Sequence, residues 1–107
     1  MLQFEIYKDS NEYHFRVADN DDVILLSREG SKQKEGILKA IDAVKKNAPV
    51  PKSIEKKETK DGYFFFTVTN SFGAVVCTST MFYSSQERDR WLNDIQKEIP
   101  QINIVES

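Results

Sequence analysis

The sequence offers few side chains with catalytic or metal-binding potential. It contains one histidine, His14, and one cysteine, Cys77. A catalytic base needs a partner that orients it, and a metal site needs several clustered His, Cys or carboxylate ligands. We therefore expect His14 to be a surface side chain. Cys77 lies in an apolar stretch with no adjacent cation, so we expect a buried and unreactive thiol. No cofactor and no metal ion are predicted.

Hydroxyl groups gather in one turn, at Ser79, Tyr83 and Ser84. A small enzyme that uses this turn, or His14, is one of the functions that the sequence leaves open. Such an enzyme needs a concave site in which polar groups converge. No glycine-rich phosphate loop is present, because the glycines are scattered through turns. We expect a protein that is not an enzyme.

The remaining charged clusters are typical of solvated surface. Asp19, Asp21 and Asp22 resemble part of a calcium loop, but the glycine and the distal glutamate of such a loop are missing. We expect a tight turn there. The lysine-rich stretch 52–60 is interrupted by acidic residues, which is typical of a strand edge protected against aggregation.

Length and composition set limits on the class of protein. The chain has 107 residues, of which 30% are charged and 39% hydrophobic, and its net charge is −2. These values indicate one globular domain. The acidic balance disfavours nucleic acid as the partner. The sequence shows no signal peptide and no apolar run of membrane-spanning length, so we expect a cytoplasmic protein with no membrane contact.

Alternation of apolar and polar residues predicts strands, and helical spacing of apolar residues predicts two helices. We expect Ser31 to cap the first helix, and Ser84 with Glu87 to form a capping box on the second, with Trp91 on its core-facing stripe. The strands are predicted at 4–8, 12–18, 23–27, 53–58, 63–69, 74–79 and 102–105, and the helices at 32–47 and 85–98.

The chain repeats its pattern at an offset of 51 residues. Phe15 falls on Phe66, Val17 on Val68 and Pro49 on Pro100. A strand pattern and a helix pattern that recur at one offset indicate an internal repeat. We predict an α+β domain, residues 1–107, built from tandem pseudo-symmetric β-β-β-α repeats at about 1–51 and 52–107. They form one mostly antiparallel sheet with two helices on one face, and the C-terminal strand closes back on the first repeat.

Several motifs resemble the YegP-like family over nearly the whole chain. They are Phe4-Glu5-Ile6-Tyr7-Lys8-Asp9, Tyr13-x-Phe15-Arg16, the helix ending Val44-Lys45-Lys46-Asn47-Ala48-Pro49, and Asp61-Gly62-Tyr63-Phe64-Phe65-Phe66. The resemblance implies tandem strand-rich repeats in one sheet with exchanged C-terminal strands. It implies no chemistry, because the family is uncharacterised. Asp21-Asp22 and Ser31 depart from the family pattern.

Because both helices are expected on one face, the other face of the sheet is expected to be open. Alternation places Tyr7, His14, Arg16, Phe65 and Thr67 on it, together with Glu5 and Thr69. We interpret this face as the partner surface of a small non-enzymatic binding or accessory domain, whose partner is an unknown protein or small ligand. The alternative is a weak binder of single-stranded nucleic acid, through base stacking, or of a small anion held by Arg16 and His14. A monomer is expected, with a strand-exchanged dimer as the alternative.

Overall fold

The computed structural model describes residues 1–20 and 22–106. Every predicted strand and helix is present there, with bounds that differ by at most two residues from the prediction. In chain order the elements are β1 (Leu2–Asp9), β2 (Glu12–Asp19), β3 (Asp22–Ser27), α1 (Lys34–Asn47), η1 (Pro51–Ser53), β4 (Ile54–Glu58), β5 (Phe64–Thr69), β6 (Val75–Ser79), α2 (Ser85–Glu98), η2 (Ile99–Gln101) and β7 (Ile104–Glu106).

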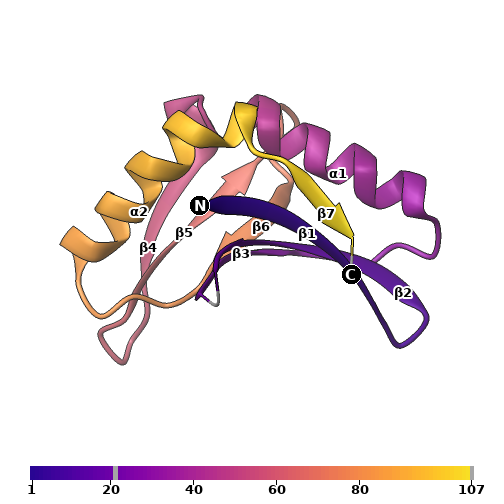
Figure 1. The fold of residues 1–107 in the computed structure, drawn as a ribbon. Helices are drawn as coiled ribbons and strands as arrows, with labels where there is room; N and C mark the ends of the chain where they lie inside the picture. The colour runs from indigo at the N-terminus through magenta and orange to yellow at the C-terminus, as the bar shows by residue number, and fades with distance from the viewer. Residues whose placement is uncertain (21, 107) are drawn as a thin grey trace.

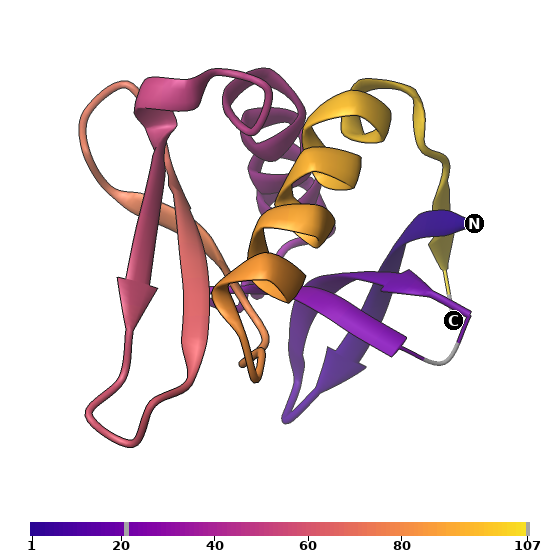
Figure 2. The ribbon, with the colours of Figure 1, turned by 90° about the vertical axis from the view of Figure 1, so that its left-hand side faces the viewer.

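The strands form one sheet in the order β4-β5-β6-β3-β2-β1-β7. Neighbouring strands are antiparallel except β1 and β7, which are parallel. Both helices lie on one side of this sheet and leave the other side uncovered (Figure 1). In the view turned by 90°, β4 and β7 lie at opposite margins with α2 between them (Figure 2). The α+β architecture and the mostly antiparallel sheet are therefore confirmed. The last strand returns to the first half of the chain as predicted, where its partner is β1.

The core lies between the sheet and the helices. On β1 and β2 the alternate residues Phe4, Ile6, Phe15 and Val17 are buried, as a half-buried strand requires. The rings of Phe4 and Phe15 meet edge to face with their centroids 5.9 Å apart. The helices contribute their apolar stripes to the same cluster, and Trp91 packs against it from α2, as predicted.

Several details of the two halves recur 51 residues apart. Helices α1 and α2 begin at Lys34 and Ser85, and each has 14 residues. A β-bulge follows Val17 in β2, and another follows Val68 in β5. Isolated bridges join Tyr13 to Ser31 and Phe64 to Phe82. None of the helices in the described part of the chain is long and apolar enough to span a bilayer.

The predicted cap of the first helix is wrong, and that of the second is right. Ser31 lies in the bridge with Tyr13, and its hydroxyl bonds the backbone of Gln33, so α1 begins only at Lys34. In α2, the Ser84 hydroxyl accepts from the Glu87 amide at 3.1 Å. The predicted turn of acidic residues before β3 includes Asp21, which lies outside the described residues; its neighbour Asn20 has a φ of 56°.

Candidate functional site

The open face carries a stacked group of four side chains on β1 and β2, called here the Arg16 stack. Cross-strand pairing places Tyr7 opposite His14 and Glu5 opposite Arg16. The rings of Tyr7 and His14 stack with their centroids 5.6 Å apart and an angle of 22° between their planes. The Arg16 guanidinium lies 4.9 Å from the centre of the Tyr7 ring. Its Nε donates to the Glu5 carboxylate at 2.7 Å.

The Arg16 stack is held tightly but remains accessible. The side chains of Arg16 and Glu5 are 39% and 25% exposed. Gly30 packs directly against the His14 ring, because a Cβ built on Gly30 would lie only 2.7 Å from the ring atom Cε1. A larger residue at position 30 would therefore displace the ring. Contacts among the four side chains, and the contact of His14 with Gly30, fix the stack. Its outer surface remains partly exposed.

Phe65 and Thr67 lie on the same face but not in the same group. They are on β5, and β6 and β3 separate β5 from β2. At about 4.8 Å per strand, they lie roughly 14 Å from the Arg16 stack. Phe65 is half-buried, whereas Thr67 is 4% exposed. The prediction that Thr67 is on an accessible surface is therefore wrong, because Thr67 lies between Glu55 on β4 and Thr78 on β6, which flank it on the same face.

The Thr67 hydroxyl is buried without a hydrogen-bond partner among the described residues. Its neighbour on the same face, Thr69, is also buried, and donates to the Ser53 carbonyl at 3.1 Å. Thr67 and Thr69 are thus unavailable to a partner, whereas the β1–β2 part of the open face remains partly exposed.

The hydroxyls of the turn after β6 serve the backbone. Ser79 is buried, and its Oγ accepts from the Phe66 amide at 2.9 Å and donates to the Thr80 carbonyl at 2.8 Å. Ser84 caps α2. Tyr83 is exposed, and its ring lies 5.7 Å from that of Tyr63. Within residues 1–20 and 22–106, the hydrogen bonds of both serine hydroxyls are to backbone groups, whereas an activated nucleophile is hydrogen-bonded to a base.

Cys77 is buried, as predicted. Burial raises the pKa of its thiol to about 12, because an apolar environment disfavours the thiolate. Among the described residues, no group of three or more His, Cys, Asp or Glu side chains is placed to hold a metal ion. The Arg16 stack remains the only predicted group of the described chain whose members the structure brings together.

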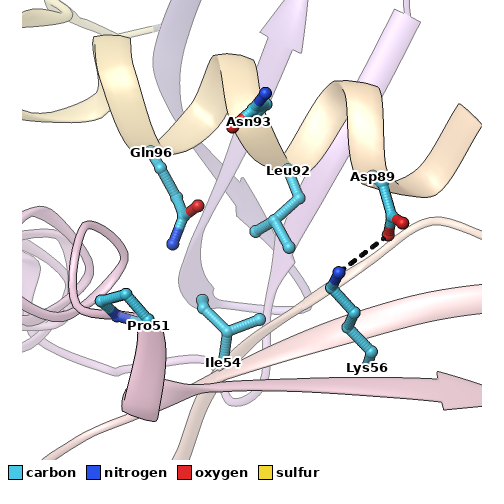
Figure 3. A pocket seen from close by; sticks show the side chains of 7 residues that line it. All are labelled: Pro51, Ile54, Lys56, Asp89, Leu92, Asn93 and Gln96. Atoms are coloured by element: carbon cyan, nitrogen blue, oxygen red, sulfur yellow. Dashed lines mark ion pairs between the residues drawn. The ribbon is translucent and has the colours of Figure 1, made fainter. Parts of the chain in front are cut away.

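A pocket of about 440 Å³ lies between β4 and α2, and the sequence did not predict it (Figure 3). Ile54 on β4 and Leu92 on α2 point toward each other from its two sides, and an ion pair between Lys56 Nζ and Asp89 Oδ1 at 3.2 Å closes one end. The other lining residues are Pro51, Asn93 and Gln96. Residues more than 30 positions apart meet here, and no local pattern in the sequence signals such a meeting.

Two cations, Lys56 and Arg88, contact the Asp89 carboxylate at this pocket. Desolvation raises the pKa of Asp89, but hydrogen bonds from Arg88 and Lys56 outweigh it, so the pKa lies below its usual value. Asp89 is therefore ionised at neutral pH and is shared between Lys56 and Arg88. The pocket thus combines apolar walls with a charged network at one end.

Comparison with known proteins gives a family but no activity. A domain of unknown function, DUF1508, matches residues 9–55. A UPF0339 protein encoded in the ptx operon 5′ region of Stutzerimonas stutzeri is 35% identical over 104 residues, which cover 96% of this chain and 94% of the relative. A UPF0339 protein of Agrobacterium fabrum is 37% identical over 57 residues, which are 52% of this chain but 92% of that relative.

The solution NMR structure of YegP from Escherichia coli, described as a protein of unknown function, has the same fold. Its TM-score is 0.87 at 26% sequence identity, over 99% of this chain and 92% of that one. The YegP resemblance of the strand and helix-end motifs thus agrees with the comparison of structures. Together with the identity to the Stutzerimonas relative over nearly the full length of both proteins, it shows that this chain belongs to the UPF0339 family, the family of YegP.

Proposed function

We propose that the protein is a non-enzymatic binding module that contacts a partner protein through the Arg16 stack on its open sheet face. The observation that carries the proposal is the stack itself: Glu5, Tyr7, His14 and Arg16 are fixed by mutual contacts and remain partly exposed on a face that no helix covers. Tyr and Arg are the residues that protein interfaces favour. Because the stack is already ordered, a partner that binds it immobilises few additional side chains.

Two features favour a protein over an anion or a nucleic acid. The Arg16 guanidinium already donates to Glu5, so its charge is compensated. The Tyr7 ring has Arg16 over it and His14 beside it, which leaves little free ring surface for a base to stack on. A polar, aromatic and nearly neutral surface is typical of a protein–protein interface.

The serine geometry supports the non-enzymatic character of the proposal. Both Ser79 and Ser84 are engaged by backbone groups. His14 contacts an aromatic ring and lies on the sheet face, away from the turn that holds these serines. A triad-like arrangement needs the nucleophile and its base within hydrogen-bond reach.

We infer also that the domain is a duplication, with copies at about 1–51 and 52–107. Support comes from the helices, bulges and bridges that recur 51 residues apart. A family match confined to 9–55 and a relative of about half the length give independent support. Each copy has an apolar sheet face that it cannot bury alone, which is a physical reason for joining two.

Site-specific photocrosslinking tests the binding proposal. A benzophenone amino acid is placed at position 7 on the open face, or at the exposed position 39 on α1 as the control. In cells that naturally express the protein, we expect a discrete crosslinked protein from position 7 and not from position 39. That partner is then purified, and its affinity is measured by calorimetry.

Matched variants complete the experiment. Arg16→Gln should weaken binding of the partner about tenfold or more, as loss of a central interface arginine does. Arg90→Gln removes the same charge from an exposed position on α2 and should leave the affinity unchanged. Equal effects of the two variants, or the same crosslinks from both positions, would overturn the proposal. Salt-dependent amide shifts of Tyr7, His14 and Arg16 with short oligonucleotides would replace it with the nucleic-acid alternative.

A further inference from the structure

The two edges of the sheet are not equivalent. At one edge, β7 pairs in parallel with β1 at Phe4, Glu5 and Ile6. At the other edge, β4 has β5 as its single neighbour. Strand β4 pairs with β5 in the same way as β1 pairs with β2, since Ile54 faces Val68 and Phe4 faces Val17. Strand β4 thus occupies the place of β1 but lacks the strand that covers β1.

The hydrogen-bonding groups on the outer side of β4 follow from one contact. The Ile54 amide donates to the Pro51 carbonyl, so it points away from β5. In an antiparallel ladder, alternate residues direct their backbone groups to the same side. Lys56 and Glu58 therefore also direct their amides and carbonyls outward. These are the groups that a further strand would use.

Charge and strand length together decide which register suits a second copy of β4. When two copies of β4 pair antiparallel about a two-fold axis, the outward-directed residues of one copy must face those of the other. One residue then faces its own equivalent in the second copy, and the axis lies between these two residues. With the axis at Lys56, Glu55 faces Lys57 of the second copy and Lys57 faces its Glu55. With the axis at Glu55, Glu55 faces Glu55 and no opposite charges meet. With the axis at Lys57, Lys57 faces Lys57 and Lys56 faces Glu58, which is as balanced as the Lys56 register, but only part of β4 then faces β4, whereas the Lys56 register pairs the strand over all five residues. Like charges directly opposite destabilise a sheet, and opposite charges stabilise it.

With Lys56 on the axis, the side chains of β4 on the helix-covered face are compatible with pairing. Lys56 comes to face Lys56 of the second copy, and the repulsion between them is weakened by the Asp89 carboxylate of each copy, which lies 3.2 Å from Lys56 and also pairs with Arg88. On the open side, Glu55 and Lys57 are already neighbours within one strand, 3.6 Å apart. Pairing two copies makes these two ion pairs into a four-membered network. Ile54, half-buried in one copy, gains cover from the second.

We propose that two copies of this protein associate through their β4 edges, antiparallel and with Lys56 on the two-fold axis. The pairing joins the two sheets into one and closes the free edge, and because it is isologous it stops at a dimer. This inference is separate from the binding role of the Arg16 stack, which lies at the β1–β2 end of the sheet. It also replaces the monomer that the sequence suggested.

Sedimentation equilibrium of the full chain, from about 10 µM to about 1 mM, measures the association, and weak dimers fall in this range. Glu55→Lys and Lys57→Glu each create two like-charge contacts in the dimer, so each should raise the dissociation constant about tenfold or more. The double variant Glu55→Lys with Lys57→Glu restores opposite charges, and its dissociation constant should return close to that of the wild type. Glu58→Lys is the matched control, because Glu58 faces the uncharged Ile54 in this register.

Lys56→Pro tests the backbone pairing. The Lys56 amide points outward, so proline should be tolerated in the single copy but should abolish association. Amide spectra establish that each variant is folded, and hydrogen exchange of the wild type gives a measurement that needs no variant. At high concentration the Lys56 amide should become protected, and the Lys57 amide should not change. A wild type that stays monomeric at about 1 mM, or a double variant as weak as the single ones, would overturn the proposal.

Discussion

A two-residue turn decides which side chains of the open face meet. Ser10 and Asn11 both have positive φ, at 53° and 65°. Such a turn fixes the register of the hairpin that it connects. That register places Tyr7 opposite His14 and Glu5 opposite Arg16. Alternation along each strand predicted that these side chains share a face. Their direct contact depends on the turn, which the sequence marked only through Ser10 and Asn11.

Thr67 shows that alternation predicts the face on which a residue lies but not its exposure. Its position in β5 correctly predicts the face on which it lies. Its burial depends on the side chains of neighbouring strands, and strand order cannot be read from a period of two. The sequence could thus predict that the members of the Arg16 stack share a face of the sheet. It could not predict how exposed each residue of the proposed site is.

The Cys77 thiol gives a pH-dependent prediction at the same scale. Its pKa is raised from the usual 9.0 to about 12 in the folded protein. Above the unfolded pKa, only the unfolded chain releases this proton, so the stability present below that pKa is lost as the pH rises toward 12. Relative to Cys77→Val, the free energy of unfolding of the wild type should fall by about 1.4 kcal/mol per pH unit above about pH 9.

Urea titrations of both proteins at several alkaline pH values measure this difference. The comparison with Cys77→Val cancels the contributions of lysine and tyrosine side chains, which both proteins share. A constant difference across the alkaline range would show that the thiolate is tolerated in the folded state.

Among the elements, helix starts separate what local sequence can and cannot predict. Ser84 and Glu87 stand three residues apart before an apolar stripe, and Ser84 caps α2 as that pattern predicts. Ser31 has the right residue type but is drawn into a bridge with Tyr13, an interaction across 18 positions of sequence. Gln33 therefore becomes the N-cap residue of α1, and its side chain makes no capping bond.

Opposite effects on stability are expected at these two helix starts. Ser84→Ala removes a capping bond and should cost about 1 kcal/mol, while Ser85→Ala, one position later, should cost much less. Gln33→Ser places a capping hydroxyl on an extended backbone and should stabilise the protein by about 0.5 to 1 kcal/mol. Thermal and urea unfolding measure all three variants. A loss of stability in Gln33→Ser would mean that α1 does not need the cap.

For the whole molecule, the single sheet and the return of its last strand could be predicted by counting strands around the two helices. The pocket beside β4 and the bare β4 edge could not, because both depend on which strand ends the sheet. The charges of the stretch 52–60 gave the only sign of an edge. Alternation of apolar and polar residues indicates which side chains of a strand are buried. It does not indicate whether another strand pairs with that strand, so it cannot identify an edge.

The last prediction concerns the segment that leads into β7, the strand that covers β1. Ile102 and Ile104 have the same side chain and lie two residues apart, but Ile102 is 8% exposed and Ile104 is 40% exposed. Ile102 belongs to the core cluster, so Ile102→Ala should cost about 3 kcal/mol, and Ile104→Ala less than about 1 kcal/mol. The amide of Phe4, which donates to the Asn103 carbonyl, should lose much of its protection from hydrogen exchange in Ile102→Ala alone. Equal losses of stability in the two variants would mean that Ile102, which precedes β7, contributes no more to the core than Ile104 does.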